Sequence, residues 1–89
     1  MARNRLRFWG RVQGVGFRYT ALHLAQSLGL TGWVQNQRDG SVLMEVQGRS
    51  ETIQRMIDGL ERGTFIQIER MEKQEIPHDD YERRFKIKE

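Results

Sequence analysis

Residues 5–18 read RLRFWGRVQGVGFR, and this stretch decides the fold. Apolar Leu6, Phe8 and Val12 alternate with arginines through residues 5–12, which predicts a strand with one buried face. Glycines at positions 14 and 16 then break the alternation, because glycine adopts positive φ angles at little cost. The stretch therefore predicts a strand, a tight loop and the start of a helix.

Two segments show the apolar spacing of a helix. In the first, apolar residues recur at i, i+4, i+7, i+8 and i+11 from Phe17, and Gly29 follows as a C-terminal cap. The second begins at Ser50, which we expect to cap it, and ends at Gly63. The two predicted apolar stripes are Phe17, Ala21, Leu24, Ala25 and Leu28, and Ile53, Met56, Ile57 and Leu60.

Four further segments are predicted to be strands. The second strand covers about residues 31–37, and Asp39-Gly40 then gives a hairpin signal. The third strand alternates through residues 42–47, and the fourth runs from Ile66 toward Ile76. A loop around residues 77–80 precedes a short last strand at residues 85–88, where Phe85 and Ile87 alternate with lysines.

The predicted order is strand, helix, strand, strand, helix, strand, with one short strand added at the C-terminal end. Right-handed crossovers then give an α+β fold of the ferredoxin-like split βαβ type (βαββαβ). We expect an antiparallel sheet with two helices on one face, built as a single domain over residues 1–89. Because this architecture supports many functions, the function has to be inferred from particular residues.

The amino-acid composition excludes several kinds of functional site. Fifteen Lys and Arg against 12 Asp and Glu give a net charge of +3, as on an ordinary mixed-charge surface. The absence of cysteine excludes disulfides, thiolate zinc sites and a cysteine nucleophile. With no signal-like or membrane-spanning apolar run, we expect a cytoplasmic monomer with no membrane or nucleic-acid partner. We expect His23 and His78 at the surface, and Asp79-Asp80 in a turn rather than at a metal.

The passage from loop to helix at residues 13–18 is a candidate phosphate site. Backbone N–H groups at a helix start have no internal partner, and the helix dipole adds positive charge there. The positive charge of Arg18 in the first turn is electrostatically unfavourable unless an anion offsets it. Its planar guanidinium can donate hydrogen bonds to two phosphate oxygens at once. The stretch is neither a Walker loop nor a dinucleotide fingerprint. An ordinary strand-to-helix turn with a solvated arginine explains these residues equally well.

Asn36 is the second unusual residue, since asparagine is depleted in strands. Its amide offers donors and an acceptor but does not titrate, so it can hold a water molecule and cannot act as a base. A polar residue tolerated beside a hairpin is the alternative interpretation.

Two stretches together resemble the two motifs of the acylphosphatases: residues 10–18, GRVQGVGFR, and residues 32–42, GWVQNQRDGSV. The resemblance implies hydrolysis of the carboxyl-phosphate anhydride of an acyl phosphate to carboxylate and inorganic phosphate, without metal or cofactor. It implies that Arg18 and Asn36 are catalytic, Asn36 by positioning the attacking water. It also implies a phosphate cradle formed by Gln13, Gly14, Val15, Gly16, Phe17 and Arg18. The resemblance weakens after Gly63. The residues do not distinguish aromatic from metabolic acyl phosphates as the substrate.

Two other functions remain open from the residues. Acylphosphatase-like domains also occur within larger proteins, such as the hydrogenase-maturation carbamoyltransferase, so a non-catalytic phosphate-binding domain is one alternative. An RNA-binding module is the other, because Trp9 lies between Arg7 and Arg11 on a polar strand face.

Overall fold

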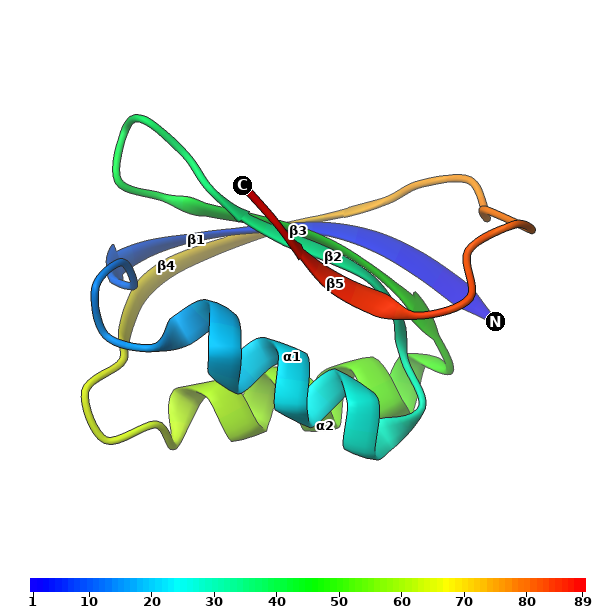
Figure 1. The fold of residues 1–89 in the computed structure, drawn as a ribbon, viewed down its shortest axis with the longest axis horizontal. Coiled ribbons are helices and arrows are strands. Elements are labelled where there is room, and N and C mark those ends of the chain that lie inside the picture. Colours follow the sequence, from blue (N-terminus) through cyan, green and yellow to red (C-terminus); the bar gives the residue numbers. More distant parts are fainter.

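The structure, a computed structural model that describes residues 1–89, is a five-stranded sheet with two helices against one face (Figure 1). Sequence patterns place both helices and the last four strands close to their observed positions. The strands are β1 (Ala2–Arg11), β2 (Thr31–Asn36), β3 (Val42–Gly48), β4 (Gln67–Glu75) and β5 (Phe85–Lys88). The helices are α1 (Phe17–Leu28) and α2 (Ser50–Glu61).

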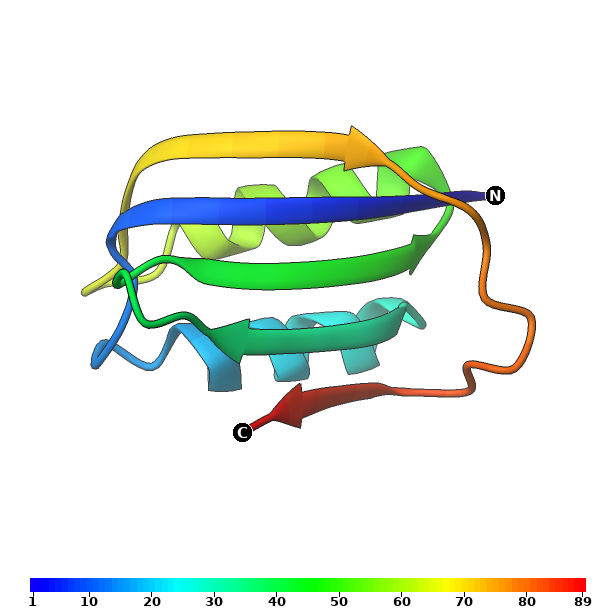
Figure 2. The same cartoon turned by 90° about the horizontal axis from the view of Figure 1, so that it is seen from above.

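The strand order is β4-β1-β3-β2-β5, as Figure 2 shows from above. The first four strands pair antiparallel, which confirms the ferredoxin-like arrangement. The short C-terminal strand β5 pairs parallel to β2, so the complete sheet is mixed. It has this direction because residues 76–84 carry the chain past the ends of the strands to the far edge before β5 begins (Figure 2).

The core lies between the sheet and the helices and contains the predicted apolar faces. Leu6 and Phe8 of β1 are fully buried, as are Val42 and Met44 of β3. The rings of Phe8 and Phe17 lie 5.0 Å apart and tilted, a favourable aromatic arrangement. Phe17 is the first residue of α1, so this contact fixes where the helix starts relative to the sheet.

Two local predictions are wrong. Strand β1 begins at Ala2, before the alternation at residue 5, because Arg3 and Asn4 pair with β3 although both are polar. Ser50 does not cap α2: it is the first helical residue, Arg49 occupies the N-cap, and no side-chain capping bond forms. Glu51 in the first turn complements the helix dipole there.

Neither helix is long and apolar enough to cross a membrane.

Candidate active site

Two glycines with positive φ angles shape the loop between β1 and α1. Gly14 has φ 72° and Gly16, the N-cap of α1, has φ 79°, both in the left-handed region that other residues enter at a cost. Nothing lies within 4 Å of a Cβ atom built at either position, so these sites require backbone freedom rather than space. The glycine N-cap also leaves the helix start without a capping side chain.

The N–H groups around this helix start are free. No hydrogen bond within the chain is donated by a backbone N–H of residues 13–19, and the first helical bond runs from Thr20 N–H to the Gly16 carbonyl, at 2.9 Å. Consecutive free N–H groups at a helix start, together with the helix dipole, favour an anion. The predicted cradle residues therefore have unused donors.

Arg18 lies in the first turn of α1 and is half-buried. Its guanidinium makes no ion pair or hydrogen bond within the chain, and the first turn of α1 contains no acidic residue. The repulsion between this cation and the helix dipole is therefore not offset by the protein itself. A phosphate anion at the same place would offset it.

Asn36 is the last residue of β2 and pairs with Val42 of β3. Side chains alternate along a strand, so Asn36 is on the same face of the sheet as buried Val34, the face that the helices cover. Its Oδ1 atom is buried and has no hydrogen-bond partner. A buried acceptor without a partner is unusual, and it fits a residue that binds a water molecule or substrate.

The side chain of Gln13 joins the loop to the β2–β3 hairpin. Its Nε2 donates to the carbonyl of Gln37 at 2.8 Å and to the carbonyl of Ser41 at 2.9 Å. These two residues close the hairpin immediately after Asn36, and Gln37 N–H bonds the Ser41 carbonyl at 2.9 Å. Sequence reasoning gave Gln13 only a place in the backbone cradle and missed this link, because no spacing pattern indicates it.

The hairpin itself is shaped by Asp39. Its Oδ1 accepts from the backbone N–H of Ser41 at 2.9 Å and from the Ser41 hydroxyl at 2.6 Å. These bonds, with a smaller contribution from Arg7 at 3.8 Å, hold the pKa of the Asp39 carboxyl below its usual value. The Asp39-Gly40 turn predicted from the sequence is thus confirmed, with Gly40 at φ 91°.

The predicted site residues gather at one end of the sheet, where β1 and β2 end and α1 begins (Figure 1). The Phe17 side chain is buried in the core, so only its backbone is available at the loop, and Val15 also packs against the core. The predicted surface positions of His23 and His78 are confirmed, and His78 bonds the carbonyl of Met1 at 2.8 Å.

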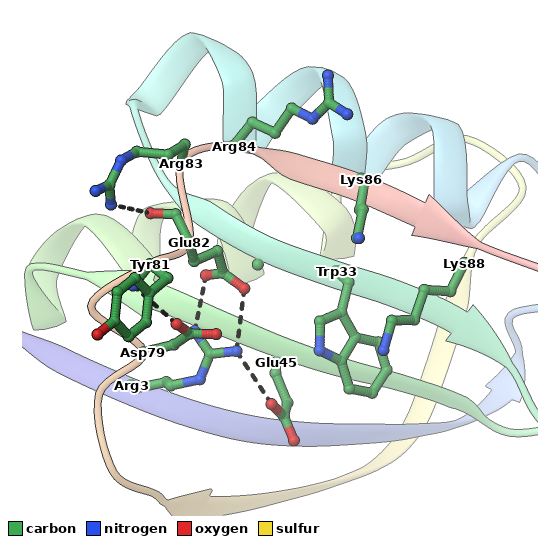
Figure 3. A pocket seen from close by; sticks show the side chains of 11 residues that line it. Arg3, Trp33, Glu45, Asp79, Tyr81, Glu82, Arg83, Arg84, Lys86 and Lys88 are labelled. Carbon is green, nitrogen blue, oxygen red and sulfur yellow. Dashed lines mark hydrogen bonds and ion pairs between the residues drawn. The ribbon is translucent and has the colours of Figure 1, made fainter.

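A separate hollow of about 450 Å³ lies on the open face of the sheet, under residues 79–84 (Figure 3). The Arg3 guanidinium bonds Glu82 at 2.7 and 3.1 Å and Glu45 at 3.1 Å, and Arg5 also bonds Glu45. Glu82 raises the pKa of Arg3. Burial alone would raise the pKa of Glu45, but the bonds from Arg5 and Arg3 outweigh it and lower that pKa. Arg83, Arg84, Lys86 and Lys88 also line this hollow, so charge alone does not exclude an anion there. The loop is the candidate active site because its N–H groups and the Arg18 guanidinium have no partner within the chain.

Comparisons with known proteins give matches to acylphosphatases. An acylphosphatase family model matches residues 4–87. The acylphosphatase of Geobacillus kaustophilus is 48% identical over 81 residues, covering 88% of this chain and 84% of the relative. The acylphosphatase of Clostridium acetobutylicum is 39% identical over 88 residues, covering 98% and 97%.

Solved structures are similar as well. The crystal structure of acylphosphatase from Bacillus subtilis matches with a TM-score of 0.91 and 32% identity, covering all of both chains. T. kodakarensis HypF matches this whole chain with a TM-score of 0.85 and 34% identity, over only 12% of its own length. The family model and the curated relatives cover nearly the entire sequence, and this chain therefore belongs to the acylphosphatase family.

Proposed function

We propose that this chain hydrolyses the carboxyl-phosphate anhydride of acyl phosphates, giving a carboxylate and inorganic phosphate. The observation that carries the proposal is the run of free N–H groups at residues 13–19 around the unpaired guanidinium of Arg18. These groups supply donors and positive charge for the phosphoryl oxygens, as transition-state stabilisation in phosphoryl transfer requires. One chain supplies every residue of the site, within a single domain over residues 1–89.

Asn36 positions the attacking water. Its buried, unpartnered Oδ1 is an acceptor for a water proton, which would direct the water oxygen toward phosphorus. The new bond forms between that oxygen and phosphorus while the bond from phosphorus to the acyl oxygen breaks. A non-bridging phosphoryl oxygen takes the proton, so no side chain has to act as a base.

The leaving group explains why this small site suffices. A carboxylate leaves readily without protonation, so the reaction needs no general acid. The protein's tasks are to hold the phosphoryl group and to orient the water. For the same reason we propose that hydrolysis requires no metal or cofactor. We also propose that the chain acts in the cytoplasm on small-molecule substrates.

The RNA-binding alternative is not favoured. The Trp9 ring is covered by the guanidinium of Arg70 at 4.5 Å, with that of Arg7 at 5.9 Å. The neighbouring central strand β3 presents no aromatic residue on which a second base would stack. Salt-sensitive RNA binding without acyl-phosphate hydrolysis would instead support this alternative.

Two substitutions separate phosphate binding from turnover. Arg18→Ala removes a bidentate donor, so we expect it to weaken inorganic phosphate binding and lower kcat/KM by about 100-fold or more. Asn36→Ala should lower kcat by a similar factor and leave phosphate binding within about twofold of native. Calorimetric titration with inorganic phosphate measures phosphate binding, and initial rates on benzoyl phosphate measure turnover. Native turnover by Asn36→Ala would contradict the role in positioning water.

A further inference from the structure

Phe65 is exposed in the turn that joins α2 to β4. It is 68% exposed, and among the large hydrophobic residues only Met1 and Tyr81 are more exposed. The turn itself is anchored, because Ile66 N–H donates to the Gly63 carbonyl at 3.3 Å and the Ile66 side chain is buried in the core. The fold therefore holds an aromatic side chain in solvent on an anchored turn.

This turn lies next to the phosphate cradle of residues 13–18. Strand β1 leads into the cradle and β4 leaves the turn, and Arg11 at the end of β1 pairs with Gln67 at the start of β4. The adjoining residues, Val12 and Ile66, are both buried in the core. Figures 1 and 2 show the turn and the cradle at the same end of the sheet, where α1 begins. A single exposed apolar side chain is ordinary on most surfaces, but beside an anion site it can contact the rest of the ligand.

The direction of the reaction places the acyl group on the side of the cradle away from Asn36. In an in-line displacement the leaving oxygen lies opposite the attacking water, across phosphorus. Asn36, which we propose holds that water, ends β2, and β3 separates β2 from β1. The turn at residues 63–66 precedes β4, on the other side of β1, and Figure 1 shows the cradle between the end of β2 and this turn. The acyl group is therefore directed toward Phe65.

We propose that Phe65 contacts the acyl group of the bound substrate and makes this chain select acyl phosphates with an aromatic acyl group. This selectivity rests on the proposed hydrolysis of acyl phosphates. A benzoyl group can cover the exposed ring and remove apolar area of both from water, whereas an acetyl group offers only one methyl group to the contact. The cradle holds the phosphoryl group of either substrate. The contact between two rings should favour the aromatic substrate by about fivefold.

Phe65→Ala tests this selectivity through initial rates on benzoyl phosphate and acetyl phosphate. We expect kcat/KM for benzoyl phosphate to fall about fivefold, because the aromatic acyl group loses its contact. The value for acetyl phosphate should stay native, because the cradle is unchanged. An equal fall for both substrates, or no change in either, would overturn the proposal while leaving the proposed hydrolysis intact.

Two further variants serve as controls. Phe65→Tyr keeps the aromatic ring and should keep native kcat/KM for both substrates. Tyr81 is also exposed, but it belongs to residues 76–84 at the opposite end of the sheet (Figure 2), so Tyr81→Ala should be native as well. Both positions are exposed, and circular dichroism checks that each variant folds. A loss of selectivity in Tyr81→Ala equal to that in Phe65→Ala would contradict a local contact.

Binding of two phosphonates separates the Phe65 contact from the proposed hydrolysis. Phenacylphosphonate and acetonylphosphonate replace the bridging oxygen of benzoyl phosphate and acetyl phosphate by a methylene group, so neither is hydrolysed at that bond. Calorimetric titration should show about fivefold tighter binding of phenacylphosphonate to the native chain, and similar binding of both to Phe65→Ala. If the native chain hydrolyses neither substrate but shows this difference, the proposed hydrolysis fails and the contact stands. Equal native affinity for the two phosphonates, or binding of neither, would overturn the contact.

Discussion

Gln13→Ala tests whether the phosphate loop depends on the hairpin that carries Asn36. The Gln13 amide donates two hydrogen bonds of 2.8 and 2.9 Å across this contact. Removing the amide frees the loop from the hairpin without altering the free N–H groups or the glycine conformations. We therefore expect the phosphate donors and the water-holding amide to lose their fixed relative position.

The size of the stability effect depends on whether the two carbonyl acceptors of the Gln13 amide keep another hydrogen bond. Each lost hydrogen bond costs about 1 kcal/mol when the remaining partner stays satisfied. The Gln37 carbonyl still accepts from Gly40 N–H at 3.2 Å, and the Ser41 carbonyl still accepts from Gln37 N–H. Neither acceptor is left without a partner, so we expect a total loss of about 2 kcal/mol in the free energy of unfolding.

The effect on catalysis should be larger than the stability change explains. A misplacement of about 1 Å can reduce a rate 100-fold, so we expect kcat/KM for benzoyl phosphate to fall about 10- to 100-fold in folded protein. Urea unfolding and initial rates measure the two effects. Gln37→Ala is the matched control, because its amide makes only contacts of 3.3 and 3.4 Å, both to Gln35 of β2. Native stability and native kcat/KM in Gln13→Ala would refute the positioning role.

Two further changes test the sheet. The pKa of Glu45 is lowered in the folded chain, so its contribution is present at neutral pH and is lost as pH falls through the folded pKa. Glu45→Gln should thus cost about 2 kcal/mol at neutral pH, with the gap to native closing in urea unfolding as the pH falls below the usual pKa of a glutamate carboxyl. Gly32→Ala places a Cβ 1.9 Å from the Glu45 carbonyl oxygen at φ 145°, so we expect a loss above about 3 kcal/mol. Its control Gly29→Ala meets no atom within 4 Å and should cost about 1 kcal/mol in thermal unfolding.

The periodic parts of the fold are predictable from the sequence because burial imposes them locally. The strand containing Phe8 and the helix starting at Phe17 each display the spacing of a buried face. The early start of β1 is not predictable in this way. Arg3 is buried because Glu45 and Glu82, both distant in sequence, bond its guanidinium.

The same distinction applies to the candidate site. Arg18 and the glycine loop carry local chemistry, so the sequence identifies them. The bonds from Gln13 to the hairpin join residues 24 and 28 positions apart, and no periodicity indicates such contacts. The burial of the Asn36 amide oxygen likewise depends on tertiary packing.

Hydrolysis of benzoyl phosphate by the purified chain in excess EDTA, beside Arg18→Ala, tests the central claim most directly. Arg18 makes no ion pair within the chain, so its removal should leave the urea unfolding midpoint close to native. We predict rapid turnover by the native chain and loss of nearly all of it in the variant. Absence of turnover in folded native protein, or equal turnover in Arg18→Ala, would contradict the account.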